Sequence, residues 1–114
     1  MKAEIISIGS ELTSGAKLDT NSQWLSSQLS EIGIPVHFHA TMADDRQTML
    51  EVFQTAVNRS DIVLVTGGLG PTLDDLTREL IAQLTGTELV LDEPSLEFIE
   101  KLFSKRGRVM SDRN

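Results

Sequence analysis

A strand pattern and a glycine-rich turn follow one another in the stretch that decides the fold, Asp61-Ile62-Val63-Leu64-Val65-Thr66-Gly67-Gly68-Leu69-Gly70-Pro71-Thr72. Its first half is a continuous run of branched apolar residues, which is typical of a central parallel strand covered on both faces. The three glycines that follow let backbone N–H groups approach an anion closely. A helical pattern begins near Leu76, and its N-terminus would add partial positive charge beside the turn. The stretch therefore predicts a buried strand that ends in a phosphate-binding turn.

Strand and helix patterns alternate on both sides of this stretch. Residues 3–8 and 34–40 predict two further strands, and residues 88–91 a short one. The first helix is predicted to begin at Thr20 with a capping box to Gln23, and Trp24 lies on its apolar face, which predicts a core position. Asp44 is the predicted cap of a second helix, a third closes at Gly86, and a last one begins near Pro94. This order predicts a parallel sheet with helices on both faces.

Composition limits the classes of function. The chain has 114 residues, a net charge of -7 and no cysteine, which indicates one domain without disulfides or thiolate ligands. Residues 1–100 carry a net charge of -11, which argues against binding to nucleic acid, whereas residues 101–114 carry +4, interpreted as a solvated helix end. No apolar run is long enough for a membrane span or a signal peptide, so we expect a cytoplasmic protein.

The turn after the third strand is the first candidate site, because parallel sheets bind ligands beyond the strand C-termini. Gly67, Gly68 and Gly70 would cradle a phosphate through backbone N–H groups, Pro71 would stiffen the turn, and Thr72 would cap the helix or donate to the phosphate. Asp74 and Asp75 would repel a phosphate unless a divalent cation bridged them to it, and oxygen ligands favour magnesium or manganese. Alternatively, the two aspartates only complement the helix dipole.

The loop after the first strand is the second candidate site. It is longer than most connections between a strand and a helix. Ser10 and Glu11 directly follow the strand and are expected to face the glycine turn, and Asp19 and Asn21 are candidates for holding a ribose or a metal-bound water. Lys17 is a candidate phosphate contact. The alternative is a polar surface loop that ends in a helix cap.

With these motifs in view, the sequence resembles the N-terminal domain of the CinA (competence/damage-inducible) family, which belongs to the molybdopterin-binding superfamily of molybdenum-cofactor biosynthesis proteins. The resemblance covers nearly all of residues 1–114. It rests on Gly9-Ser10-Glu11-Leu12, Gly15, Asp19-Thr20-Asn21, Trp24-Leu25, Asp44-Asp45, Gly67-Gly68-Leu69-Gly70-Pro71-Thr72, Asp74-Asp75-Leu76-Thr77 and the end Gly107-Arg108 with Met110 and Asn114.

The resemblance implies a three-layer α/β/α fold with a mixed five-stranded sheet and a pocket between the first and third strand loops. It also implies hydrolysis of the pyrophosphate of ADP-ribose with a divalent cation (magnesium, manganese or cobalt), aided by potassium. Asp74 and Asp75 would then be the catalytic and metal-binding residues. Relatives in cofactor biosynthesis bind molybdopterin in the equivalent pocket, which leaves a binding module without turnover as the alternative.

The resemblance further implies segments that this sequence does not contain, among them a strand, a glycine-rich loop that helps close the pocket, and a deamidase domain. We therefore expect a CinA-type domain over residues 1–114 that is incomplete at its C-terminus. A fragment without function of its own is a third alternative. Homo-oligomerisation is also expected, because an incomplete sheet or pocket would leave apolar surface exposed.

Overall fold

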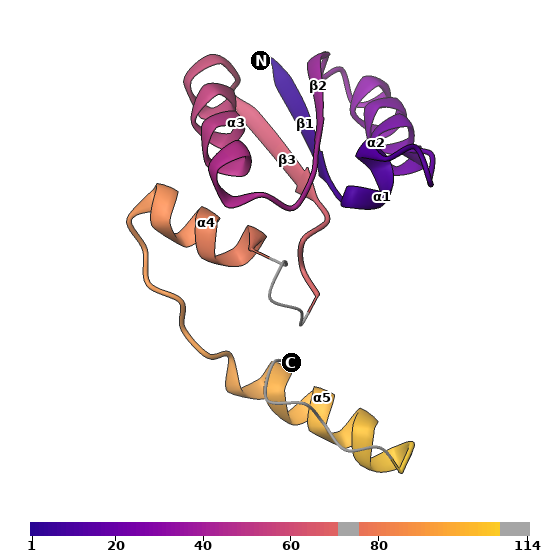
Figure 1. The fold of residues 1–114 in the computed structure, drawn as a ribbon, viewed down its shortest axis with the longest axis vertical. Helices are drawn as coiled ribbons and strands as arrows, with labels where there is room; N and C mark the ends of the chain where they lie inside the picture. The colour runs from indigo at the N-terminus through magenta and orange to yellow at the C-terminus, as the bar shows by residue number, and fades with distance from the viewer. Residues whose placement is uncertain (71–75, 108–114) are drawn as a thin grey trace.

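A three-stranded parallel sheet forms the centre of the molecule (Figure 1). The computed structural model describes residues 1–70 and 76–107. The strands are β1 (Ala3–Ile8), β2 (Val36–Met42) and β3 (Ile62–Thr66), in the order β2-β1-β3. Both neighbours of β1 run parallel to it, which requires crossover connections, and the intervening helices provide them. The predicted parallel sheet is confirmed, and the described residues contain three of the five strands that the family resemblance implies.

The central strand is β1 and not β3. All six residues of β1 are buried, whereas all five residues of β3 are half-buried. The prediction of a central place for the Asp61–Thr66 run is wrong for the described part of the chain, because there β3 pairs with β1 alone. A continuous apolar run shows that both faces of a strand are shielded, but it does not give the number of neighbouring strands.

Helices cover both faces of the sheet, so the α/β/α layering is confirmed. In Figure 1, α2 (Thr20–Glu31) lies on one side of the sheet and α3 (Arg46–Arg59) on the other, and α4 (Thr77–Thr85) packs against α3. Side chains of β1 alternate between these two layers. Ile6 and Ile8 belong to the core on the α3 side, which also contains Met42, Met49, Phe53, Ala56 and Leu80.

The helix ends are fixed by aspartate caps and a glycine. Asp19 caps α2 by accepting from the backbone N–H of Ser22 at 3.1 Å, and Asp45 caps α3 by accepting from that of Thr48 at 2.9 Å. The predicted caps, Thr20 and Asp44, are each wrong by one residue. In both cases the neighbouring carboxylate is the group that reaches the free N–H. Gly86 ends α4 in the left-handed conformation, as predicted.

A buried ion pair ties the end of α3 to β1 at the amino edge of the sheet. Glu4 is fully buried, and its carboxylate accepts from Arg59 Nε at 2.9 Å, Arg59 Nη2 at 2.7 Å and Ser60 Oγ at 3.0 Å. The Arg59 guanidinium lies 3.7 Å from the centroid of the Phe38 ring. Because Glu4 has three donors, its charge is satisfied despite burial.

The remaining elements lie outside this core. The short helix α1 (Ser10–Thr13) follows β1, and α5 (Glu93–Lys105) lies well apart from the sheet (Figure 1). The strand predicted over residues 88–91 does not form. Trp24 is 62% exposed, so its predicted core position is also wrong. Within residues 1–70 and 76–107, no helix combines the length and apolarity that a membrane crossing requires.

Candidate ligand-binding site at the carboxyl ends of β1 and β3

A pocket of about 230 Å³ opens where β1 and β3 end. The chain passes from β1 to β2 on one side and then to β3 on the other, so this edge is the topological switch point where open parallel sheets bind ligands. The pocket combines the ends of both strands with the first loop and the start of α2. Its lining residues are Ser7, Ile8, Glu11, Leu12, Lys17, Leu18, Asp19, Thr20, Asn21, Thr66 and Gly67.

The turn after β3 presses its backbone against β1. Gly67 has φ +96°, and a Cβ atom there would lie 2.1 Å from the carbonyl oxygen of Ile8. Gly68 has φ +65°, and a Cβ atom there would lie 2.2 Å from Thr77 Oγ1. Neither position has room for a side chain, and both have backbone angles that favour glycine. Bare backbone therefore forms this wall of the pocket.

Thr77 holds the turn in place from the start of α4. It is 2% exposed, its hydroxyl donates to the Gly67 carbonyl oxygen at 2.8 Å, and its N–H donates to the Gly68 carbonyl oxygen at 3.3 Å. The residue pattern gave Thr77 no role in the site, although it belongs to the block that carries the family resemblance. Its position at the first turn of a helix after a glycine turn is the signal that could have identified it.

Asn21 connects α2 to the end of β3. Its side-chain amide donates to Thr66 Oγ1 at 3.4 Å, across the mouth of the pocket. Because Asn21 and Thr66 are 45 positions apart, this contact exists only through the tertiary fold. It brings the two loops proposed from the sequence together at one site.

Asp19 lines the pocket and also caps the amino end of α2. Its carboxylate accepts from the Ser22 N–H and, at 2.6 Å, from the Ser22 hydroxyl, which in turn lies 2.7 Å from the hydroxyl of buried Ser7. Burial alone would raise the pKa of Asp19, but the hydrogen bonds from Ser22 and Ser7 outweigh it and lower that pKa. Asp19 is therefore ionised at neutral pH.

Glu11 and Lys17 bring opposite charges to the lining. The Lys17 backbone N–H donates to the Glu11 carbonyl oxygen at 3.0 Å, which closes the first loop over the pocket. The Glu11 side chain folds back over Gly9, where a Cβ atom would lie 2.6 Å from Glu11 Oε1. Lys17 gives the lining a cation suited to a phosphate group.

The structure gathers only some of the predicted site residues. Glu11, Asp19, Asn21 and Gly67 line the pocket, and Gly68 is not part of the lining but lies against Thr77. The Ser10 hydroxyl instead donates to Asp44 Oδ2 at 3.4 Å, and Ser10 and Gly70 are not part of the lining. Pro71, Thr72, Asp74 and Asp75 lie outside the described residues.

The described residues do not by themselves make a metal centre. Among residues 1–70 and 76–107, no group of three or more Asp, Glu or His side chains could hold an ion. The pocket has the carboxylates of Glu11 and Asp19, and both Asp19 oxygens already accept hydrogen bonds.

This combination of fold and pocket defines a class: three-layer α/β proteins that hold a small molecule at the carboxyl edge of a parallel sheet, against a glycine turn. The particular family follows from comparison. Residues 4–113 match the family described as "Probable molybdopterin binding domain", and the chain belongs to that family.

Comparison with individual proteins confirms the resemblance to CinA. The chain is 48% identical to a CinA-like protein of Dictyoglomus thermophilum over 114 residues, all of this chain but 28% of that protein. The crystal structure of CinA from Thermoplasma acidophilum superposes with a TM-score of 0.83 at 32% identity, covering 98% of this chain and 65% of that one. The chain thus spans little more than a quarter of the Dictyoglomus relative.

Molybdopterin biosynthesis enzymes share the fold. The MoaB structure from Thermus thermophilus superposes with a TM-score of 0.67 at 22% identity, covering 73% of this chain and 54% of that one. The smaller coverage contrasts with the 98% reached by the Thermoplasma protein, whose match therefore includes a counterpart of α5.

Proposed function

We propose that this chain binds a phosphate-bearing small molecule in the pocket at the ends of β1 and β3, and that in its complete form the domain hydrolyses the pyrophosphate of ADP-ribose-type dinucleotides. The observation that carries the proposal is the turn after β3, where neither Gly67 nor Gly68 has room for a side chain and the backbone of Gly67 lines the pocket. Backbone approach of this kind suits phosphate oxygens.

Charge and position support a phosphate ligand. Lys17 contributes a cation to the lining, and Asn21 and Thr66 contribute neutral polar groups next to it. The carboxyl groups of Asp19 and Glu11 suit the hydroxyl groups of a sugar better than a second phosphate, because carboxylates accept hydrogen bonds and repel anions. The lining therefore fits a ligand that joins phosphate to a polyhydroxylated group.

The proposal of hydrolysis is based on the resemblance of the sequence to the CinA family. The adjacent carboxylates Asp74 and Asp75, with a divalent cation (magnesium, manganese or cobalt) and potassium, are its proposed catalytic groups.

A binding module without turnover is the second candidate. The family description names molybdopterin binding, which is compatible with this candidate. The ligand would again carry a phosphate, so both candidates use the same pocket.

One experiment separates the two candidates. ADP-ribose is titrated into the chain by calorimetry with and without magnesium, and AMP release is followed by chromatography. AMP formation supports hydrolysis, binding without AMP supports the second candidate, and absence of both overturns the proposal for this chain. A longer chain, with the segments that follow in its relatives, is assayed in parallel.

Two lysine variants test whether ligand binding takes place in this pocket. Lys17→Ala is expected to weaken binding about tenfold, in keeping with the loss of one charge-assisted hydrogen bond. Lys2→Ala, at the opposite edge of the sheet, is the matched control and should bind normally. Equal effects of the two substitutions would contradict the assignment of the pocket.

The aspartate assignment has its own test in the longer chain. Asp74→Asn should abolish metal-dependent release of AMP while the unfolding midpoint stays unchanged. Asp61→Asn, which lies before β3 at the far edge of the sheet, serves as the control. Unchanged turnover in Asp74→Asn would contradict its proposed role.

A further inference from the structure

A serine lies near the carboxyl end of the buried central strand β1. Ser7 is fully buried, and its partners in the sheet are Thr41 of β2 and Thr66 of β3. These three residues place a row of hydroxyl-bearing side chains across the sheet at the edge where the pocket opens, and Ser7 and Thr66 belong to the pocket lining. Burial of a hydroxyl group is unfavourable unless it forms a hydrogen bond, so the Ser7 hydroxyl requires a partner.

The first turn of α2 provides that partner. Ser7 Oγ lies 2.7 Å from Ser22 Oγ, which is 15 positions along the chain, and Ser22 Oγ lies 2.6 Å from Asp19 Oδ2. Ser22 is 4% exposed, so both hydroxyl groups are shielded from water. The amino end of α2 is therefore joined to β1 through buried hydroxyl groups that lead to Asp19 in the pocket.

The direction of these hydrogen bonds follows from the number of protons. An ionised carboxylate can only accept, so Ser22 donates its one hydroxyl proton to Asp19. Ser22 Oγ then has no proton for Ser7, and Ser7 must donate to Ser22. Both protons point toward Asp19, and successive donors polarise one another, which strengthens the hydrogen bond that reaches the carboxylate.

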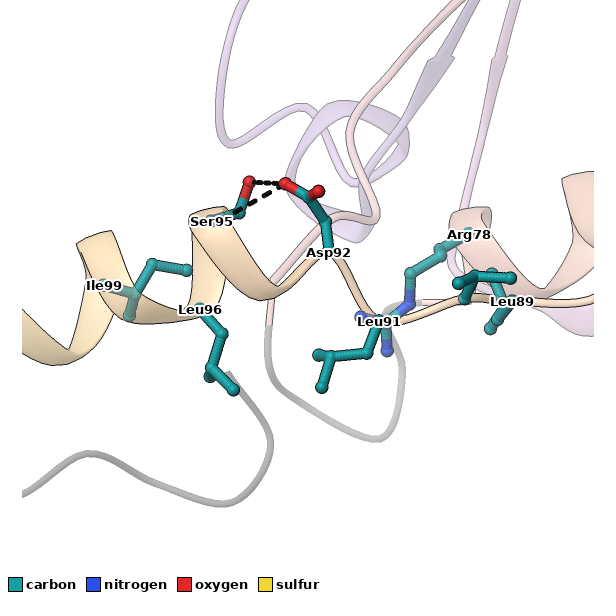
Figure 2. A pocket seen from close by; sticks show the side chains of 8 residues that line it. Arg78, Leu89, Leu91, Asp92, Ser95, Leu96 and Ile99 are labelled. Carbon is teal, nitrogen blue, oxygen red and sulfur yellow. Dashed lines mark hydrogen bonds between the residues drawn. The ribbon is translucent and has the colours of Figure 1, made fainter.

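Helix capping explains Ser22 but not Ser7. Ser22 supplies both its N–H and its hydroxyl to the capping aspartate, and its equivalents in the other two caps are exposed. Ser7 comes from a strand and is the additional group behind the cap of α2. The same cap, an aspartate that accepts from the N–H and hydroxyl of the residue three positions later, begins α3 (Asp45 with Thr48) and α5 (Asp92 with Ser95, Figure 2).

We infer that Ser7 is a positioning residue for the ligand: through Ser22 it holds the Asp19 carboxylate ionised and in one orientation, as the hydrogen-bond acceptor for a sugar hydroxyl in the pocket. This inference rests on the proposed function and extends it from the phosphate to the sugar part of the ligand. Each Asp19 oxygen accepts one hydrogen bond from Ser22, Oδ1 from the N–H and Oδ2 from the hydroxyl, and each has a further lone pair for a ligand.

The surroundings of Asp19 set the expected pH dependence. Burial raises the pKa of Asp19, but the hydrogen bonds from Ser22 and Ser7 and the nearby His39 of β2 lower it below its usual range. The first loop adds two charged groups to the same lining, Lys17 and Glu11. Because the Ser7 hydroxyl favours the ionised carboxylate, its removal should raise the pKa of Asp19.

The first test follows the carboxyl group of Asp19 by carbon-13 NMR as the pH is lowered. Ser7→Ala should raise the pKa of Asp19, because the hydrogen bond from Ser22 is no longer strengthened from behind. Ser27→Ala, an exposed change of the same type on α2, is the matched control and should leave that pKa unchanged. An unchanged pKa of Asp19 in Ser7→Ala overturns the inference, whether or not the chain binds ADP-ribose.

Urea unfolding separates a positioning role from a purely structural one. In Ser7→Ala, Ser22 still donates to Asp19, so no buried donor is left without a partner and the unfolding midpoint should stay close to that of the unmodified chain. A Ser7→Ala chain that unfolds at a much lower urea concentration but binds ADP-ribose normally would assign Ser7 to stability alone and overturn the inference.

The second test measures ADP-ribose binding by calorimetry at several pH values. Ser7→Ala should weaken binding about fivefold at neutral pH, and the loss of affinity in acid should begin at a higher pH, since only the ionised carboxylate offers all its lone pairs. Asp19→Asn keeps a capping side chain, and in that background Ser7→Ala should have no further effect, because Ser7 acts through Asp19. Losses that multiply in the double variant contradict this route.

Two outcomes separate this inference from the proposed function. If the unmodified chain does not bind ADP-ribose, the proposed function fails for this chain and the sugar contact fails with it, while the titration of Asp19 still decides whether Ser7 positions the carboxylate. If the unmodified chain binds ADP-ribose and Ser7→Ala binds it equally well at every pH, the positioning role is overturned and the proposed function stands.

Discussion

Gly67 has no room for a side chain, since its Cβ would lie 2.1 Å from the backbone oxygen of Ile8. Gly67→Ala should lower the free energy of unfolding by about 3 kcal/mol, because backbone must move and the left-handed angle adds strain. Urea unfolding measures this change. Gly86→Ala is the control: its angle is also left-handed, but no atom lies within 4 Å of the added Cβ, so we expect a loss of about 1 kcal/mol. Equal losses would show that strain alone matters at Gly67.

Thr77 acts on the same turn through its hydroxyl. Thr77→Val keeps the shape but removes the donor to the Gly67 carbonyl oxygen, which should cost about 1–2 kcal/mol of stability and weaken ligand binding. Thr77→Ser keeps the donor and should bind ligand almost normally. Urea unfolding and calorimetry measure both effects, and normal binding by Thr77→Val would exclude a role for this hydrogen bond.

At the scale of single residues, the sequence identified some members of the candidate site and missed others. The glycines of the turn and Asn21 were identifiable because their composition and place in unusual loops differ from the surroundings. Ser7 and Thr77 were missed by the residue pattern. A serine in a buried strand and a threonine in a helix are ordinary locally, and only their distant partners give them a role.

At the scale of elements, the Glu4–Arg59 pair controls how α3 meets β1. Hydrogen bonds from Arg59 lower the pKa of Glu4 against the opposing effect of burial, and Ser60 lowers it further. A carboxyl group with a lowered pKa stabilises the fold above its unfolded-state pKa, and this stability is lost as the pH falls through the folded-state pKa. Stability should therefore decline from about pH 5 downward.

Glu4→Gln should remove this part of the pH dependence. At neutral pH it should cost about 2 kcal/mol, less than for a fully buried pair because the Arg59 side chain is 39% exposed. Urea midpoints between neutral and acidic pH measure both effects. Glu51→Gln, an exposed change on α3, is the control. An unchanged acid slope in Glu4→Gln would assign the acid sensitivity to other carboxyl groups.

At the scale of the whole molecule, we expect the free energy of unfolding not to depend on α5. The core lies within β1 to α4, and among the described elements none packs extensively against α5. A chain that ends at Thr87 should therefore keep the far-UV spectrum of its remaining elements. Its free energy of unfolding, measured in urea, should equal that of the full chain within about 0.5 kcal/mol. A large loss of stability would show that the residues after Thr87 belong to the core.

The sequence by itself determined the alternation of the three strands with the longer helices, the three layers, the helix caps to within a residue and the two loops that meet at the pocket. These properties depend on local periodicity and turn chemistry, which neighbouring residues specify. Tertiary structure alone decided that β1 is central, that Trp24 is exposed, that Thr77 holds the glycine turn and that Ser10 faces Asp44 outside the pocket lining. The physical reason is that strand neighbours, burial and long-range hydrogen bonds join residues far apart in the chain, and no local pattern encodes them.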